Sequence, residues 1–363
     1  MESPREDNWS IGVFVYYIYV NISAPIIVAF LVIGQAKSKA ATNCMNRIGR
    51  VTKTMSKVGI PDDYAATMKY QLIAICGSVL FFITIFTLES KIHDYRKSGV
   101  STTVGYMGRM FYVTVTTFLV DYTFVDYVRY LGKRFLRLNE YLIKFSVVGQ
   151  KAKSLFQILD YDVVTSHLFR TPLADKTKIM RIVRMSRQLH AELCAIATEL
   201  TSVFGVQILL SFILGLWIII LLFFNIFNSL VPQEVLGGRT LNIATMFCWA
   251  SFALTRITLI VSNCAWTSDE ARRTGELIYE LVDSTTSIEF KEEIHGFSLQ
   301  LIQNPLRFTA SSFFTLDYSF IRTIIGTVTT YVVIMVQTRN IESSRGDERC
   351  ASAVLGNGTS CSN

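Results

Sequence analysis

The fold is decided by the last apolar run of the chain, Thr330-Tyr331-Val-Val-Ile-Met-Val-Gln337, which follows Phe308-Thr-Ala-Ser-Ser-Phe-Phe-Thr-Leu-Asp317. Three polar residues, Thr330, Tyr331 and Gln337, interrupt a predicted helix whose other residues are apolar enough to face lipid. An amide in hydrocarbon is costly unless it faces a partner or water. We therefore expect Gln337 to face protein or a pore. A glutamine that only bonds across a helix interface is the open alternative.

The composition of the whole chain is that of a polytopic membrane protein. Hydrophobic residues make up 51% of the sequence and charged residues only 17%, against about 25% charged residues in soluble domains. The formal net charge of +7 follows a membrane-topology pattern, so we expect membrane lipid and no nucleic acid as a partner. The seven cysteines show no C-x-x-C spacing and no Cys/His pattern, so no metal and no cofactor are expected.

Six stretches approach the roughly 20 apolar residues that a bilayer requires. The predicted fold is an all-α polytopic membrane helical bundle, one domain over residues 1–363, with long cytoplasmic helix extensions and a disordered polar tail at 339–363. The predicted spans are residues 11–33, 70–88, 104–128, 203–227, 244–265 and 318–337.

Orientation follows from the distribution of Lys and Arg, which favour cytoplasmic connections. They gather after the first and third spans, whereas the connection after the fourth span holds only Arg239. Both termini are then expected outside the cell, and the glycosylation sequons at Asn8 and Asn357 agree with this. The segments predicted to be cytoplasmic are 34–69, 129–202 and 266–317.

The cytoplasmic segments have helical patterns. Leu131, Phe135, Leu138 and Leu142 recur at helical spacing among basic residues, which predicts that the third span continues as a helix into the cytoplasm. Residues 266–303 carry a second amphipathic pattern. These apolar stripes need partner helices, either within the chain or in neighbouring subunits.

Among the charged residues inside predicted spans, Asp121 lies in the inner half of the third span and Arg256 lies near the middle of the fifth. Isolated charges in hydrocarbon are expensive, so we expect these two residues to form an intramembrane ion pair with a structural role. The alternative is that each charge reaches a separate membrane interface.

The sequence contains no motif typical of an enzyme active site. Four histidines are scattered at positions 93, 167, 190 and 295 without metal-ligand spacing. Neither a Gly-rich phosphate loop nor a G-x-S-x-G motif occurs. We therefore expect a protein that is not an enzyme.

The last span resembles that of insect gustatory receptors, which ends in a Thr-Tyr-x5-Gln-Phe signature. Thr330, Tyr331 and Gln337 match it, while Thr338 stands where the family has Phe. The run Phe204-Gly205-Val-Gln207 also resembles the start of that family's third-from-last span. Family members have seven spans, so the six spans here correspond to the second to seventh, and we expect that the first is missing.

The resemblance implies a tastant-gated, non-selective cation channel subunit of the plasma membrane, with an extracellular C-terminus. It implies a homotetramer, or a hetero-oligomer with related receptors, whose last spans line one pore. A pocket in each subunit would take a small organic tastant, and Val332, where sweet-taste members often have Glu, speaks against a sugar. Aromatic residues in the outer halves of the spans are candidate pocket linings, with interface or packing roles as the alternative: Tyr16, Tyr17, Tyr106, Phe111 and Tyr112.

Helical spacing places Thr330, Val333 and Gln337 on one stripe of the last span. We expect this stripe, with Thr338 beside it, to form the pore and its gate. Tyr331 lies off the stripe and is expected to bond to a neighbouring span. A secondary transporter and a G-protein-coupled receptor are the alternatives. Paired broken spans, typical of the first, and the Asp-Arg-Tyr motif of the second are both missing from the sequence.

Overall fold

A computed structural model describes residues 11–60, 64–95, 100–158, 172–230, 236–280 and 288–357. Within these ranges, no side chains are described for residues 11–20, 22, 92–95, 100–107, 109–110, 145–158, 172–179, 227–230, 236–239, 280 and 339–357. Seven helices and one short hairpin make up these residues. Their bounds are α1 Ile11–Lys57, α2 Tyr64–Tyr95, α3 Val100–Ile158, α4 Pro172–Leu230, α5 Leu236–Glu280, α6 Ile288–Gln303, β1 Thr309–Ala310, β2 Phe314–Thr315 and α7 Tyr318–Asn357.

The longest helices exceed the thickness of a membrane. α3 and α4 have 59 residues each, which at ~1.5 Å per residue gives a length of roughly 88 Å, nearly three times the ~30 Å hydrocarbon core. Within the described residues, five helices are long and apolar enough to cross a bilayer: α1, α2, α4, α5 and α7. α3 is not among them because Asp121 and other charged residues interrupt its apolar run, so the span predicted at 104–128 stays a prediction.

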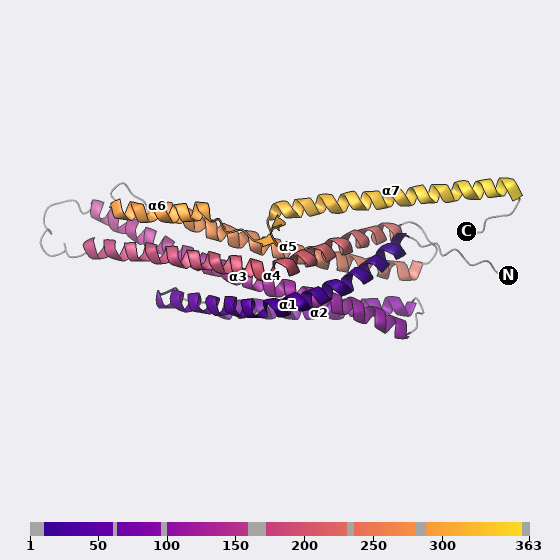
Figure 1. The fold of residues 1–363 in the computed structure, drawn as a ribbon, viewed down its shortest axis with the longest axis horizontal. Coiled ribbons are helices and arrows are strands. Elements are labelled where there is room, and N and C mark those ends of the chain that lie inside the picture. Colours follow the sequence, from indigo (N-terminus) through magenta and orange to yellow (C-terminus); the bar gives the residue numbers. More distant parts are fainter. Residues whose placement is uncertain are drawn as a thin grey trace.

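The helices divide the molecule into two halves (Figure 1). α3, α4 and α5 run through both halves, α2 and α7 lie in one, and α6 lies in the other. α7 begins near the middle of the molecule and runs to the end at which α1 also begins. The half with α7 contains the predicted spans, and the half with α6 contains the predicted cytoplasmic extensions.

The helix of the first predicted span, 11–33, continues into the segment predicted to be cytoplasmic, because α1 extends to Lys57. It ends where Gly59 takes a positive φ of 89°, which glycine adopts without steric cost. Two backbone bonds close this end, from Gly59 N to Ser56 O at 3.0 Å and from Ile60 N to Met55 O at 3.0 Å. Ile60 and Met55 are both buried, so the helix ends in a Schellman motif with its apolar contact.

The helical stripe predicted at 129–145 is confirmed. Leu131, Phe135, Leu138 and Leu142 lie on α3 and are all buried. Leu142 joins a cluster with Phe290, Ile294, Phe297 and other residues of α4, α5 and α6. The partners that this stripe requires are therefore helices of the same chain.

Polar contacts also hold together the half of the molecule that contains the predicted cytoplasmic extensions. Arg47 of α1 forms ion pairs with Glu192 at 2.9 Å and Glu199 at 2.6 Å, both on α4. Buried Asn139 of α3 donates to both the backbone oxygen and the carboxylate of Glu270 on α5. Each buried polar group of this set has a partner, which is the condition under which burial is tolerated.

The tail predicted to be disordered is helical as far as Asn357, while 358–363 lie outside the described residues. Elongation of an existing helix avoids the cost of nucleation, and 339–357 contain no proline. A polar composition therefore does not end the helix here.

The closest approach of α3 and α5 provides a test of this packing. A Cβ atom on Gly132 would lie 2.3 Å from the Trp266 ring and 2.6 Å from Thr267 Oγ1. Gly132→Ala should force the helices apart and lower stability by about 1–3 kcal/mol, measured as earlier loss of the monodisperse peak after heating in detergent. Gly49→Ala, at a position with no atom within 4 Å, is the matched control and should be neutral or stabilising. Equal stability of the two variants would contradict the packing of α3 on α5.

Candidate functional site

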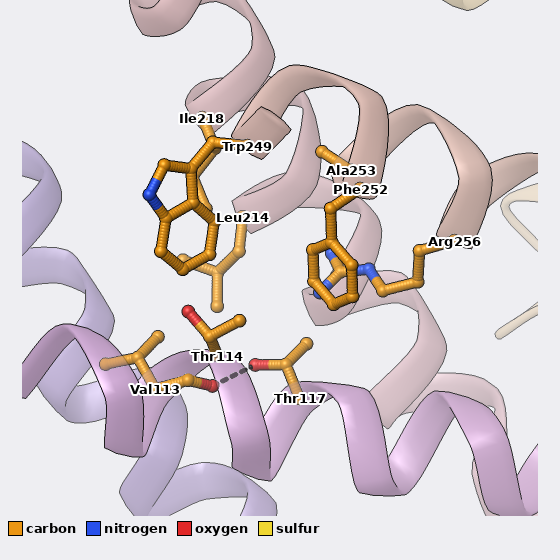
Figure 2. A pocket seen from close by; sticks show the side chains of 9 residues that line it. All are labelled: Val113, Thr114, Thr117, Leu214, Ile218, Trp249, Phe252, Ala253 and Arg256. Carbon is orange, nitrogen blue, oxygen red and sulfur yellow. Dashed lines mark hydrogen bonds between the residues drawn. The ribbon is translucent and has the colours of Figure 1, made fainter. Parts of the chain in front are cut away.

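A cavity lies between α3, α4 and α5 in the half of the molecule that contains the predicted spans (Figure 2). Its empty volume is about 360 Å³, including its open mouth. Its lining residues are Val113, Thr114, Thr117, Leu214, Ile218, Trp249, Phe252, Ala253 and Arg256.

One helix face supplies the aromatic wall and the charge of the cavity. Trp249, Phe252 and Arg256 follow one another along α5, three and four residues apart, and therefore share a face. The rings of Trp249 and Phe252 lie 6.3 Å apart. The Trp249 Nε1–H donates to Glu89 of α2 at 3.0 Å, which holds the indole in place.

Behind the wall lies a cluster of phenylalanines. Phe252 stacks on Phe81 of α2 at 4.9 Å and meets Phe82 edge to face at 5.6 Å. Phe118 of α3 also packs against Phe82 at 5.6 Å. Aromatic pairs of this kind add specific geometry to apolar burial, so the orientation of Phe252 is supported from two neighbouring helices.

The structure brings Asp121 and Arg256 together. Arg256 Nε lies 3.1 Å from Asp121 Oδ2, and the two residues are only 9% and 1% exposed. Ser211 of α4 donates to Asp121 Oδ2 at 2.7 Å, and its backbone oxygen accepts from Arg256 at 3.3 Å. Three helices therefore meet at this ion pair, which lies beside the cavity.

A glycine makes room for the arginine. A Cβ atom on Gly215 of α4 would lie 3.0 Å from a terminal nitrogen of Arg256. Any larger residue at this position would push the guanidinium, and with it the charge next to the cavity. The close approach of α4 to Arg256 therefore depends on the absence of a side chain here.

Of the aromatic residues predicted for the pocket, Phe111 and Tyr112 have described side chains, and neither is among the residues that line this cavity. Phe111 packs with Phe82 at 5.4 Å in the cluster behind the wall, and Tyr112 is 54% exposed. Tyr16, Tyr17 and Tyr106 have no described side chains. The prediction missed Trp249 and Phe252, although their spacing from Arg256 on one helix face was a usable signal.

α7 has two different faces. Ile324 and Val328 are buried in the face that packs on α4 and α5. The opposite face carries an exposed stripe at alternating spacings of four and three residues: Ser319, Thr323, Gly326, Thr330, Val333 and Gln337. The sequence-predicted pore residues Thr330, Val333 and Gln337 therefore share one uncovered face.

Two further predicted residues lie on α7 outside this stripe. Thr338 is exposed, and its hydroxyl donates to the Ile334 carbonyl at 2.9 Å. Tyr331 is 53% exposed and, among the described side chains of this one chain, has no hydrogen bond to another span. Its predicted bond would therefore have to be made to a neighbouring subunit.

The base of α7 is fixed by a capping residue and a hairpin. Asp317 accepts from the backbone N–H groups of Ser319 and Phe320, as an N-cap residue does. Bonding to Ser319, including its side chain, lowers the pKa of Asp317 below its usual range. The carboxylate therefore stabilises this helix end at neutral pH, and the stabilisation is lost as the pH falls through the lowered pKa.

Aromatic packing connects this base to α4. Phe320 stacks on Phe314 of β2 with ring centres 4.1 Å apart and meets Phe212 of α4 at 5.1 Å. Phe212 is the neighbour of Ser211, which binds the buried ion pair. Ser211 and Phe212 therefore connect Arg256, which lines the cavity, with the base of α7.

Within the described residues, no group of three or more His, Cys, Asp or Glu side chains is arranged to hold a metal. The sequon at Asn8 lies outside the described residues, and Asn357 has no described side chain. Both glycosylation sites stay predictions.

Sequence and structure comparisons both find chemosensory receptors. The model of the 7tm chemosensory receptor family matches residues 3–340. Two Drosophila melanogaster proteins, provisionally named gustatory receptors 28b and 28a, are each 22% identical to this chain, over 331 and 320 residues. These alignments cover 88% and 80% of this chain, but only 66% and 68% of the relatives, so the chain spans about two thirds of their length.

A similar fold occurs in the structure of the insect olfactory receptor OR5 from Machilis hrabei. It matches with a TM-score of 0.63 over 91% of this chain and 83% of that receptor, at 13% sequence identity. At this identity the similarity concerns the fold alone.

The buried ion pair makes a specific prediction about stability. Arg256→Met or Asp121→Leu alone leaves one buried charge without its partner, which should cost about 3–5 kcal/mol. The double variant removes both charges and should recover most of that loss, because paired apolar replacements are often tolerated. The measurement is the midpoint of thermal unfolding in detergent. A double variant less stable than both single variants would show that the pair is not the reason for the loss.

Proposed function

The chain belongs to the 7tm chemosensory receptor family, and we propose that it is a gustatory receptor subunit that forms a tastant-gated cation channel in the plasma membrane. One observation carries this proposal: the polar, uncovered stripe of α7 that ends in Gln337. The C-terminus of α7 is extracellular in this proposal, as the distribution of Lys and Arg predicts.

Gln337 is the residue that argues for a pore. The hydroxyls of Thr323 and Thr330 donate to backbone oxygens of their own helix, at 3.2 and 2.9 Å, so these two residues would tolerate lipid. The amide of Gln337 makes no such bond to its own helix. It is exposed and has no hydrogen bond to any described residue. Since an unpartnered amide in hydrocarbon is costly, water in a pore or an amide of another subunit is its favourable surrounding.

The geometry of the stripe suits a central pore. α7 covers α4 and α5 with one face and leaves the opposite face free, so four copies around an axis can turn their stripes toward one another. Val333 then forms an apolar ring that stops ions by dewetting, and Gln337 forms an amide ring that replaces part of the hydration of a cation. Thr338 is smaller than the Phe usual at this position in the family. Closure of the proposed pore therefore depends more on Val333 and Gln337 than it would with Phe.

α6 supplies a surface for subunit assembly. Its inner face buries Phe290, Ile294 and Phe297. Its outer face exposes Ile288 and Ile302, which are 77% and 76% exposed in this single chain. A helix of a cytoplasmic extension that is apolar on both faces needs a second partner. We infer that this partner is a neighbouring subunit of a homotetramer, or of a hetero-oligomer with related receptors.

The cavity between α3, α4 and α5 is the proposed tastant site. Its aromatic wall suits a small organic molecule better than a sugar, which would require many polar partners. Arg256, which lines the cavity, donates to the backbone oxygen of Ser211, next to Phe212 and the base of α7. A ligand in the cavity and the pore helix therefore act on the same turn of α4.

Single-channel recording tests the pore assignment. Gln337→Ala should change unitary conductance or basal leak while surface labelling stays near the wild-type level, because the amide faces the axis. Ile325→Ala changes an exposed residue off the stripe and should leave conductance unchanged. Well-expressed Gln337→Ala with wild-type conductance would end the pore assignment, and substrate flux without unitary currents would favour a transporter.

The oligomeric state tests the assembly surface. Ile288→Glu with Ile302→Glu should shift the purified protein from tetramer to smaller species in native mass spectrometry, because charges would be buried at the contact. Lys53→Glu changes an exposed residue of α1, away from α6, and serves as the control for added negative charge. A tetramer that survives the double substitution would place the contact elsewhere.

A further inference from the structure

We propose that the outer side of α1, within the segment predicted to be cytoplasmic, is a docking surface for an acidic helix of a cytosolic protein. Its members lie four or three residues apart, so they share one side of the helix. All six are exposed, and together they are called the basic stripe: Lys39, Asn43, Asn46, Arg50, Lys53 and Lys57. This surface is separate from the cavity and from the stripe of α7.

The basic stripe points away from the body of the molecule. Cys44, Ile48, Val51 and Met55 of α1 are buried in the main hydrophobic core, and they recur at the same helical spacing. With 3.6 residues per turn, these buried residues and the basic stripe lie on opposite sides of the helix. The packing of α1 against α4 therefore leaves the basic stripe uncovered in the single chain.

The charge of this part of α1 is not balanced by acidic residues. α1 contains no Asp or Glu over its whole length. Arg47 beside the basic stripe has carboxylate partners on α4, whereas the four cations of the stripe have no side-chain hydrogen bond or ion pair with any described residue. Asp62 and Asp63 follow α1 in the sequence, outside the described residues, and two carboxylates are too few for four cations.

Neighbouring helices mix the two signs of charge. Arg137 pairs with Glu140 on α3 at 2.9 Å, and Arg272 pairs with Asp269 on α5 at 3.6 Å. Opposite charges within one helix face compensate each other and leave little net attraction for a partner. The basic stripe has no such compensation, so electrostatic complementarity favours a partner that is acidic.

The distance from the membrane favours a protein over anionic lipid. The first predicted span ends at residue 33, and α1 continues into the half of the molecule that contains α6 (Figure 1). At ~1.5 Å per residue, Arg50 and Lys57 lie ~26 and ~36 Å further along the helix. The Debye length is ~8 Å at physiological ionic strength. Lipid headgroups therefore attract Lys39 at the near end of the stripe but are screened from its far end.

The regular spacing of the basic stripe suits a helical partner. From Lys39 to Lys57 the stripe extends over ~27 Å of one rigid helix. A second helix alongside can place a carboxylate opposite each cation, as the charged flanking positions of coiled coils do. Asn43 and Asn46, in the middle, can donate to carboxylates without adding charge. Because each exposed pair contributes little, binding depends on several pairs that form together.

A designed peptide is the probe for this surface. It is a fluorescent helical peptide with Glu at alternating spacings of three and four residues along one face. Its binding to the full-length protein in nanodiscs of neutral phosphatidylcholine is measured by fluorescence anisotropy. We expect binding that weakens at least tenfold from low to high salt, because exposed pairs are screened. A peptide of the same composition in scrambled order should bind several-fold more weakly.

A matched pair of variants assigns the binding to the basic stripe. Arg50→Glu with Lys53→Glu should weaken peptide binding about tenfold, because two attractions become repulsions. Arg273→Glu with Arg307→Glu gives the same net charge but changes exposed residues of α5 and of the connection between α6 and β1. This control should bind the peptide within about twofold of the wild-type protein. Both double variants change exposed residues only, and a monodisperse elution peak checks that each is folded.

Three outcomes would overturn the proposal. Equal losses in the two double variants would show that the peptide responds to net charge and not to this surface. Absence of peptide binding by the wild-type protein would remove the acidic helix as partner. A tenfold loss of binding in nanodiscs that contain anionic phosphatidylserine would show that the basic stripe lies on the membrane surface and binds lipid headgroups instead. We expect the affinity to be the same in both kinds of nanodisc.

Discussion

The ion pair between Asp121 and Arg256 is the contact on which the arrangement of the membrane half depends. Two charges cannot stay in an apolar bundle apart from one another, so α3 and α5 must cross where these residues meet. Ser211 adds α4 to the same point through its hydroxyl and its backbone oxygen. Three helices that are far apart in sequence are thereby held in one register, and the cavity opens beside their junction.

From this junction the structure extends in two directions. Toward the cavity, Phe252 and Trp249 stand one and two turns from Arg256 on the same helix face. Toward the pore helix, Phe212 follows Ser211 and packs on Phe320 at the base of α7. The same turn of α4 therefore contacts Arg256, which lines the cavity, and the start of the helix with the polar stripe. A movement of this turn would therefore reach both the proposed ligand site and the proposed gate.

Much of the fold could be predicted because it follows from local periodicity. The buried stripe from Leu131 to Leu142 is visible as helical spacing, and the two faces of α7 follow from residues three and four apart. Two isolated charges in apolar spans predicted their own pairing. The sequence predicted less well where the first and last helices end. The first span was expected at 11–33 and the polar tail 339–363 was expected to be disordered. The helices instead continue to Lys57 and Asn357, because an existing helix propagates through polar residues when no proline or positive-φ residue stops it.

The sequence by itself therefore determined that this is an all-helical membrane protein with a polar stripe on its last span, because these properties reside in the order of residues along single helices. Only the tertiary structure decided where the cavity lies, because its walls come from α3, α4 and α5, and their meeting depends on side-chain packing between helices. The predicted aromatic Phe111 was placed behind the wall, while Trp249 and Phe252 became the wall itself. Which aromatic residue faces a cavity is set by helix rotation and crossing, and these are fixed by contacts such as the Asp121–Arg256 pair and the close approach at Gly132.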